Sequence, residues 1–355
     1  MKRRYLNFDE KMAANFGERT WLNFLNRSLL QSSMFKRSIE EYEVTGIISN
    51  APAMAQCIAH NEEYRKEIRQ FVKSGLEPEE IYINLVIEDA KAAADLLLSI
   101  FENSNGCNGF VGIDLLPEYA YDVDALIEEA NTIWHKACRP NIMIQMPATE
   151  EALPAFKELM QSGINVNATL LCSLSRYRDI IQAHIDGIHT RLAKGLPIKR
   201  IASAATFSLP GSFERIAAPG DSTEERDILR HICLSSTLDA RRLHYDVFHN
   251  RQFVDLAGKG AQSQLLFCID DALTSYTFGR FCCARDLTIE KKASALEDSS
   301  VGEPMPAKLD SISENQSIDI EELLDTLQEE VIKTQVIQMD RALMTLKEHH
   351  EVKSC

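Results

Sequence analysis

Short apolar runs alternate with longer amphipathic stretches along most of the chain. Each run is a few residues long and is bounded by turn residues, which is typical of strands buried on both faces of a parallel sheet. The predicted strands cover residues 44–50, 109–114, 141–146, 166–171, 201–206 and 265–269. Between them, apolar residues recur at helical spacing, which predicts helices at residues 87–101, 123–136, 150–162, 176–194 and 224–248. This alternation indicates βαβ units.

The number of units predicts the architecture. Two weaker strands, near Trp21 and at residues 300–306, bring the total to about eight, which is typical of a (β/α)8 TIM barrel, here with extra helices. A final helix begins after Asp319, and residues 290–318 form a loose segment that is either a lid or a linker. We expect an N-terminal extension (1–19), a single barrel domain (20–347) and a C-terminal tail (348–355).

Charge and cysteine content narrow the function classes. Asp and Glu number 53 against 38 Lys and Arg, so the net charge is −15 and binding to nucleic acid or to an anionic membrane is not expected. No apolar run approaches the length of about 18 residues that a membrane span needs. The nine cysteines are an odd number without CxxC spacing, which predicts reduced thiols in a cytoplasmic protein.

Motifs for common cofactors and metals are missing from the sequence. There is no GxxxxGK[ST], GxSxG or HExxH pattern, and we expect neither a cofactor nor a metal. Two histidine pairs, His184 with His189 and His244 with His249, are five residues apart. That spacing puts each pair off a common helical face, so we expect surface or half-buried helix histidines.

Polar residues gather instead where the predicted strands end. In a barrel these ends form one face, and catalytic residues lie there. One such residue is often a loop cap, but the whole set favours a pocket for a small-molecule substrate. The set comprises Asn23, Asn50, Asp114, Gln145, Asn167, Thr169 and Thr206, with Asp270 and Asp271.

At these residues the sequence resembles the transaldolase family. The similar stretches are WLNFLNR at 21–27, ISNAP at 48–52, NIMIQMPAT at 141–149 and GINVNATL at 163–170. The resemblance covers about residues 18–346 and is dense from 20 to 206. It implies a barrel in which a fourth-strand lysine forms a Schiff base with a ketose phosphate. It also implies a first-strand aspartate that moves the proton, a third-strand glutamate that holds water with a fifth-strand threonine, and basic groups that bind the phosphate.

The sequence departs from this pattern at its chemical centre. Gln145 occupies the lysine position, and an amide nitrogen cannot form an imine because its lone pair is delocalised. Asn23 replaces the aspartate, and Asp114 replaces the glutamate with a shorter carboxylate. The sugar-binding asparagines and the threonine are retained as Asn50, Asn167 and Thr169.

The phosphate-binding positions also differ. The family's serine and arginine after strand six align with Pro210 and Gly211, and the region after strand seven aligns with Asp270. An acidic residue there would repel a phosphate. An ordinary transaldolase inactivated by a Lys→Gln change would account for Gln145 but not for these other departures. We therefore expect no transaldolase activity.

Two hypotheses remain open. The first is a repurposed lysine-independent lyase, isomerase, hydratase or cyclase that acts on a non-phosphorylated carbonyl compound or specialised metabolite. Asp114 would be the acid or base with Thr169 and a shared water beside it, and Gln145 would donate to the carbonyl. The other strand-end residues would bind substrate: Asn23, Asn50, Asn167, Thr206 and Asp270. The second is a non-catalytic barrel that binds or scaffolds a partner. We expect a monomer or homodimer in either case.

Overall fold

The computed structural model describes residues 19–23, 25–41, 44–208, 239–269, 280–281 and 320–351. Seven parallel strands form a curled sheet in which each strand pairs with the next along the chain, and a short eighth strand pairs antiparallel with the first. The strands are β1 (Arg19–Leu22), β2 (Val44–Ile48), β3 (Phe110–Asp114), β4 (Ile142–Pro147), β5 (Val166–Leu171), β6 (Ser203–Ser208), β7 (Leu265–Ile269) and β8 (Arg280–Phe281). This confirms the parallel α/β class. The eighth strand predicted at residues 300–306 lies outside the described residues.

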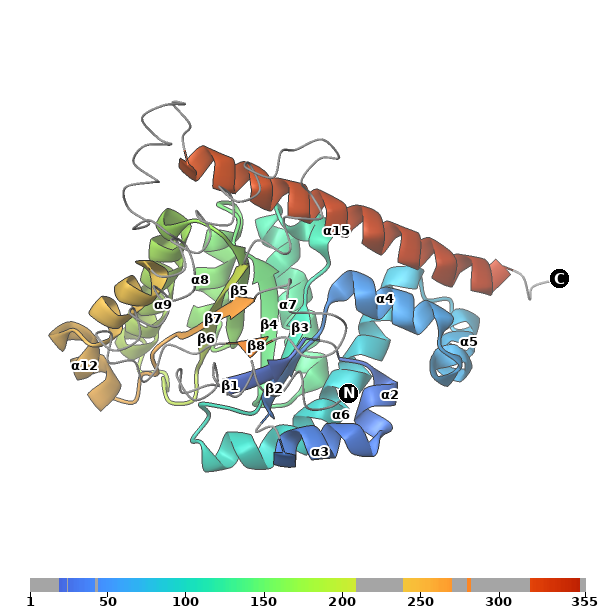
Figure 1. Cartoon of the computed structure of the whole chain (residues 1–355), viewed down its shortest axis with the longest axis horizontal. Helices are drawn as coiled ribbons and strands as arrows, with labels where there is room; N and C mark the ends of the chain where they lie inside the picture. Colours follow the sequence, from blue (N-terminus) through green and yellow to red (C-terminus); the bar gives the residue numbers. More distant parts are fainter. Residues whose placement is uncertain are drawn as a thin grey trace, which may run out of the picture.

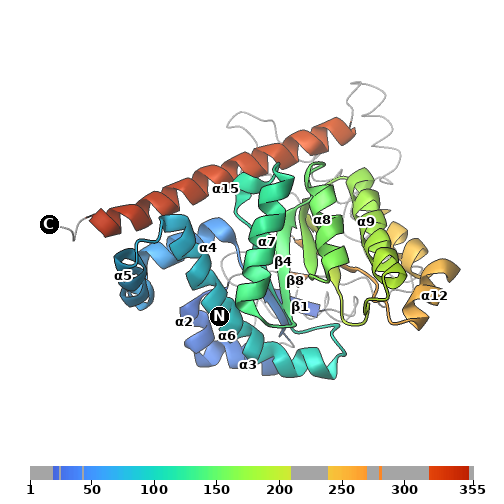
Figure 2. The same ribbon diagram turned by 180° about the vertical axis from the view of Figure 1, so that it is seen from behind.

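Helices cover the outside of this sheet (Figures 1 and 2). They are α2 (Arg27–Gln31), α3 (Ser33–Glu41), α4 (Ala51–His60), α5 (Arg65–Lys73), α6 (Pro78–Asn103), α7 (Val123–Ala137), α8 (Ala152–Ser162), α9 (Leu174–Ala193), α12 (Arg251–Gly258) and α15 (Ile320–Glu351), with 3-10 turns η1 (Glu62–Tyr64) and η2 (Pro117–Tyr119). Residues 239–248 are also helical. The helix predicted from residue 87 begins earlier, at Pro78, because Glu77 and Glu80 form a capping box and proline is favoured in a first turn. Among the described residues, no helix is long and apolar enough to cross a membrane.

The two ends of the parallel sheet meet inside the curl. Trp21 of β1 contacts Phe267 of β7 with ring centroids 4.6 Å apart, although these strands are at opposite ends of the parallel ladder. Trp21 also lies 6.2 Å from the Phe110 ring of β3. Gly46 of β2 makes room for the indole, because a Cβ at this position would lie 2.5 Å from Trp21 Cε2. The interior is therefore filled by large side chains, as in a barrel core.

Helix α15 runs across the carboxyl ends of the strands (Figure 1). It packs on α4, α6 and η2 through buried residues that include Leu324, Val331 and Leu343. The Gln328 side chain donates from Nε2 to Leu170 O at 2.8 Å and to Ala148 O at 3.2 Å. One amide thus ties the C-terminal helix to the segments where β4 and β5 end.

The prediction of surface or half-buried positions is right for one histidine of each pair and wrong for the other. His189 and His249 are exposed, as expected, but His184 and His244 are 0% and 2% exposed, so the expectation of a surface or half-buried position is wrong for them. Both are stabilised by hydrogen bonds to main-chain carbonyls distant in sequence, Gln262 O at 3.1 Å and Gln264 O at 2.7 Å. Five of the nine cysteines lie in the described part, and the four whose side chains are described are not in disulfides, as predicted: Cys57, Cys107, Cys138 and Cys172.

Candidate active site

Four of the predicted strand-end residues form one chain of hydrogen bonds. Thr206 Oγ1 donates to Asn167 Oδ1 at 2.9 Å, and Asn167 Nδ2 donates to Gln145 Oε1 at 3.0 Å. Gln145 Nε2 in turn donates to Asp114 Oδ1 at 2.9 Å. At the end of the chain, Ser49 Oγ donates to Asp114 Oδ2 at 2.8 Å. The parallel register explains this arrangement, since Asp114 lies opposite Gln145 and Gln145 lies opposite Asn167.

Gln145 is the central member of this chain. Its side chain is 1% exposed and lies over Gly112 of β3, where a Cβ would be 2.8 Å from Gln145 Cδ. Glycine at this position therefore makes the space that the long side chain fills. A second contact from Nε2, to Ser49 O, is long at 3.4 Å.

None of the described lysines between residues 136 and 259 lies beside Gln145. Lys157 belongs to α8 and pairs with Asp186 at 2.6 Å. The others lie in helices or in segments that precede strands, as the sequence predicted: Lys136, Lys194, Lys199 and Lys259. These positions provide no substitute amine at the carboxyl ends of the strands.

The environment of Asp114 determines its charge. Burial raises the pKa of the Asp114 carboxyl to about 7, and it outweighs the hydrogen bonds from Ser49, the Ala51 N–H and Gln145, which lower it. Each of these donors is neutral, so none holds the carboxylate ionised as a cation would. The carboxyl can therefore release or take up a proton near neutral pH, as a general acid or base requires.

Thr169 lies at the end of β5 in an unusual backbone segment. Its hydroxyl donates to Met146 O at 3.1 Å, and its side chain is half-buried. The next residue, Leu170, has a φ of 57°, a left-handed conformation that is uncommon for a branched side chain, and the β5–β6 register shifts here. Gln328 of α15 holds Leu170 O in this turn. The C-terminal helix thus stabilises the segment that carries Thr169.

Two further predicted residues that the structure describes, Asn50 and Asn23, do not join the hydrogen-bond chain. Asn50 is the N-cap of α4 and accepts from Ala53 N at 3.2 Å through its side-chain oxygen. Asn23 follows β1 directly and is half-buried. Asp270 lies outside the described residues, as do Pro210 and Gly211. The structure thus brings Asp114, Gln145, Asn167 and Thr206 into contact and describes Thr169, Asn23 and Asn50 at the same ends of their strands.

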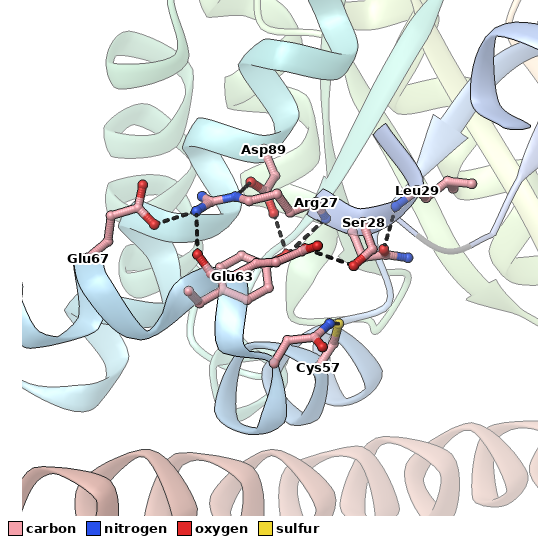
Figure 3. A network of polar contacts seen from close by, with 10 residues as sticks. Arg27, Ser28, Leu29, Cys57, Glu63, Glu67 and Asp89 are labelled. Atoms are coloured by element: carbon pink, nitrogen blue, oxygen red, sulfur yellow. Dashed lines mark hydrogen bonds and ion pairs between the residues drawn. The ribbon is translucent and has the colours of Figure 1, made fainter. Parts of the chain in front are cut away.

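A second network, which the sequence did not predict, holds the segment after β1 (Figure 3). Arg27 Nε donates to Asp89 Oδ1 at 2.8 Å, and its guanidinium also pairs with Glu67 and lies 4.5 Å from the centre of the Tyr64 ring. The Tyr64 hydroxyl donates to Asp89 Oδ2 at 2.6 Å and accepts from Arg27 N at 2.9 Å. Leu25 N also donates to Ile48 O at 3.0 Å. The sequence contained one signal for these contacts. Arg27 of this network and Ser49 of the strand-end chain belong to the motifs WLNFLNR and ISNAP, which resemble family motifs.

Comparison with known proteins gives a consistent result. The model of the family described as Transaldolase/Fructose-6-phosphate aldolase matches residues 20–207. A protein named Transaldolase 2 from Nostoc sp. strain PCC 7120 is 34% identical over 71% of this chain and 69% of its own length. A Transaldolase from Thiobacillus denitrificans is 28% identical over 86% of this chain and 87% of its own length. Together with the curled parallel sheet, these matches show that the chain belongs to the transaldolase/fructose-6-phosphate aldolase family.

Proposed function

We propose that this chain is a transaldolase-family enzyme that works without a Schiff base. Asp114 is its general acid or base, and the substrate is a non-phosphorylated carbonyl compound or a specialised metabolite. The reaction class is a lyase, isomerase, hydratase or cyclase step that begins by moving a proton next to a carbonyl. The observation that carries the proposal is the Asp114 carboxyl at the carboxyl ends of the strands, with its pKa raised to about 7 by burial.

The amides beside Asp114 support a role in binding the carbonyl oxygen. The Gln145 N–H that points to Ser49 O makes a bond of 3.4 Å, which is long for a hydrogen bond and is easily exchanged for a better acceptor. When Asp114 removes a proton from the adjacent carbon, negative charge develops on the substrate oxygen. Amide donors from Gln145 and Asn167 would stabilise that charge in the manner of an oxyanion hole.

The other residues have supporting roles in this proposal. The Thr169 hydroxyl is half-buried beside the strand ends and would hold a water shared with Asp114. Asn23 and Asn50 would bind substrate hydroxyls, and Thr206 and Asp270 would complete the pocket. We also propose that the sheet closes into a full (β/α)8 barrel, which the contact between Trp21 and Phe267 supports. The protein would act in the cytoplasm as a monomer or homodimer.

Deuterium exchange tests the chemistry directly. Dihydroxyacetone and fructose are incubated with the protein in D2O, and loss of the carbon-bound proton signals is followed by NMR. We expect exchange with the wild-type protein and a loss of about 10²–10⁴-fold in Asp114→Asn, because proton transfer by a positioned group contributes this much. The matched control is Glu129→Gln, which removes another buried carboxyl whose pKa burial raises, to about 8, outside the strand-end chain.

Three results would contradict the proposal. Exchange that persists in Asp114→Asn would remove Asp114 from the mechanism. Covalent trapping of a ketose on wild-type protein by borohydride would show that an amine forms a Schiff base after all. Exchange of fructose 6-phosphate at a higher rate than fructose would contradict the non-phosphorylated substrate.

A non-catalytic binding or scaffold protein is the second candidate, and one observation favours it. The strand-end amides and hydroxyl satisfy each other, and Gln145, Asn167 and Thr206 are 1%, 0% and 1% exposed. Such mutual bonding suits a core as well as a pocket. Native mass spectrometry of protein purified from its own host separates the two: a bound small molecule favours the enzyme, and a bare chain or one bound to partner subunits favours the scaffold.

A further inference from the structure

A cavity lies where the strands begin, at the opposite end of the sheet from Asp114. It has a volume of about 360 Å³, is open to the surface on one side, and is lined by the helix at 239–248, by α12 and by the segment that leads into β7. Helix α12 lies beside α9, on the side of the molecule away from α4 and α5 (Figures 1 and 2). The cavity is therefore separate from the candidate active site.

Flat rings form the walls of this cavity. The Phe248 and Phe253 rings meet edge to face, 4.7 Å apart at an angle of 88°, and His244 lies 4.6 Å from Phe248. His249 lines another part of the cavity, where its ring stacks on Tyr245 with centroids 4.2 Å apart. Ala257 and Ala261 add small side chains that leave the space open. Aromatic walls of this kind favour another ring, in an edge-to-face or offset-stacked position.

The charge and size of the cavity limit the class of ligand that it can bind. None of the described residues that line it is Asp, Glu, Lys or Arg, so no carboxylate, ammonium or guanidinium among them pairs with a charged ligand. Behind Phe248, the buried His184 ring is neutral because burial lowers its pKa to about 4. The volume is at the small end of the range of about 300–1,000 Å³ for ligand pockets. The Gln262 amide donates to Asn105 O at 3.1 Å, which leaves its side-chain oxygen to accept from a ligand.

We propose that this cavity binds a small, flat, uncharged aromatic or heteroaromatic compound of one or two fused rings with a single hydrogen-bond donor. The site is independent of the strand-end chemistry. Ring walls supply the contact, the lack of Lys and Arg among the described lining residues disfavours carboxylates and phosphates, and the Gln262 side-chain oxygen supplies a hydrogen-bond acceptor. Indole has these properties and serves as the probe.

The Cys107 thiol, which is not in a disulfide, lines the cavity and reports on its occupancy. The protein is alkylated with iodoacetamide with and without indole, and each cysteine peptide is quantified by mass spectrometry. We expect indole to slow alkylation of Cys107 several-fold and to leave alkylation of the exposed Cys138 unchanged. Benzoate, a charged ring of similar size, should not protect Cys107.

A cavity-filling variant shows where the probe binds. Ala257 is exposed on α12, so Ala257→Phe fills the space without disturbing the core, and it should abolish the protection by indole. If that variant does not fold, Ser263→Phe provides the same test, because Ser263 lines the cavity from the segment that precedes β7. Unprotected Cys107 in the wild type, equal protection of Cys107 and Cys138, or protection that persists in the filled variant would each overturn the proposal.

Discussion

Gln145 Nε2 donates a hydrogen bond of 2.9 Å to Asp114 Oδ1, so the group that faces this carboxyl oxygen is a neutral amide. A positive charge at that distance would favour the ionised carboxyl and lower its pKa. The amide supplies the hydrogen bond without the charge, and burial then dominates and raises the pKa of Asp114 to about 7. The single residue Gln145 thus has two effects among the described residues: its position carries no imine-forming amine, and it adds no positive charge beside Asp114.

The substitution Gln145→Lys should reverse both properties. The side chain already lies over Gly112, so a lysine of similar length fits the same space. We expect its ammonium to lower the pKa of Asp114, measured by carbon-13 NMR of the labelled carboxyl. We also expect borohydride to trap an adduct with dihydroxyacetone, detected as a mass increase. Gln145→Met, which fills the space without an amine, is the control, and equal labelling of both variants would refute the expectation.

The stability of the fold should fall as pH rises through the range set by Asp114. An aspartate in an unfolded chain has a pKa of about 3.9, and burial raises that of Asp114 to about 7 in the fold. Between these values the folded state binds more protons than the unfolded state, so the free energy of unfolding decreases with increasing pH. The upper limit is about 4 kcal/mol, since one pKa unit corresponds to about 1.36 kcal/mol.

Urea unfolding at intervals from pH 4 to pH 8 measures this effect. As pH rises, the free energy of unfolding of wild type should fall relative to that of Asp114→Asn, because the amide of the variant never ionises. Glu129 contributes with the same sign, since burial raises its pKa to about 8, but it is present in both proteins and cancels in the difference. A pH-independent difference would show that Asp114 ionises as freely in the fold as in the unfolded chain.

The sequence predicted the strands more accurately than the contacts between them. β3 and β4 lie within a residue or two of the predicted bounds, because an apolar run flanked by turn residues marks a buried strand directly. The link from Asp114 to Gln145 depends instead on the register of two strands, which the order of residues along the chain does not specify. The Arg27 network joins residues up to 62 positions apart for the same reason.

Loss of the Gln328 amide should loosen the segment that carries Thr169. Gln328→Ala removes the donor to Leu170 O and Ala148 O, and we expect a loss of about 1–3 kcal/mol because a buried and a part-buried carbonyl each lose a partner. Hydrogen exchange followed by mass spectrometry should show faster exchange in residues 169–172 and in α15. Glu330→Ala, at an exposed position on the same helix, is the control and should leave exchange in residues 169–172 unchanged.

The network around Arg27 should show a gradient of stability effects that follows burial. Arg27 and Asp89 form a pair whose side chains are 13% and 3% exposed, so Arg27→Met leaves a buried carboxylate unpaired and should cost about 3–5 kcal/mol. Tyr64→Phe removes one hydroxyl that bonds Asp89 and the Arg27 N–H, and it should cost about 1–3 kcal/mol. Glu67→Gln changes the outer pair, in which Glu67 is 41% exposed, and should cost less than about 1 kcal/mol. Chemical unfolding of the three variants at pH 7 tests this order. If Glu67→Gln and Arg27→Met lowered the free energy of unfolding equally, the exposed Glu67 and not the buried Asp89 would be the main ionic partner of the guanidinium.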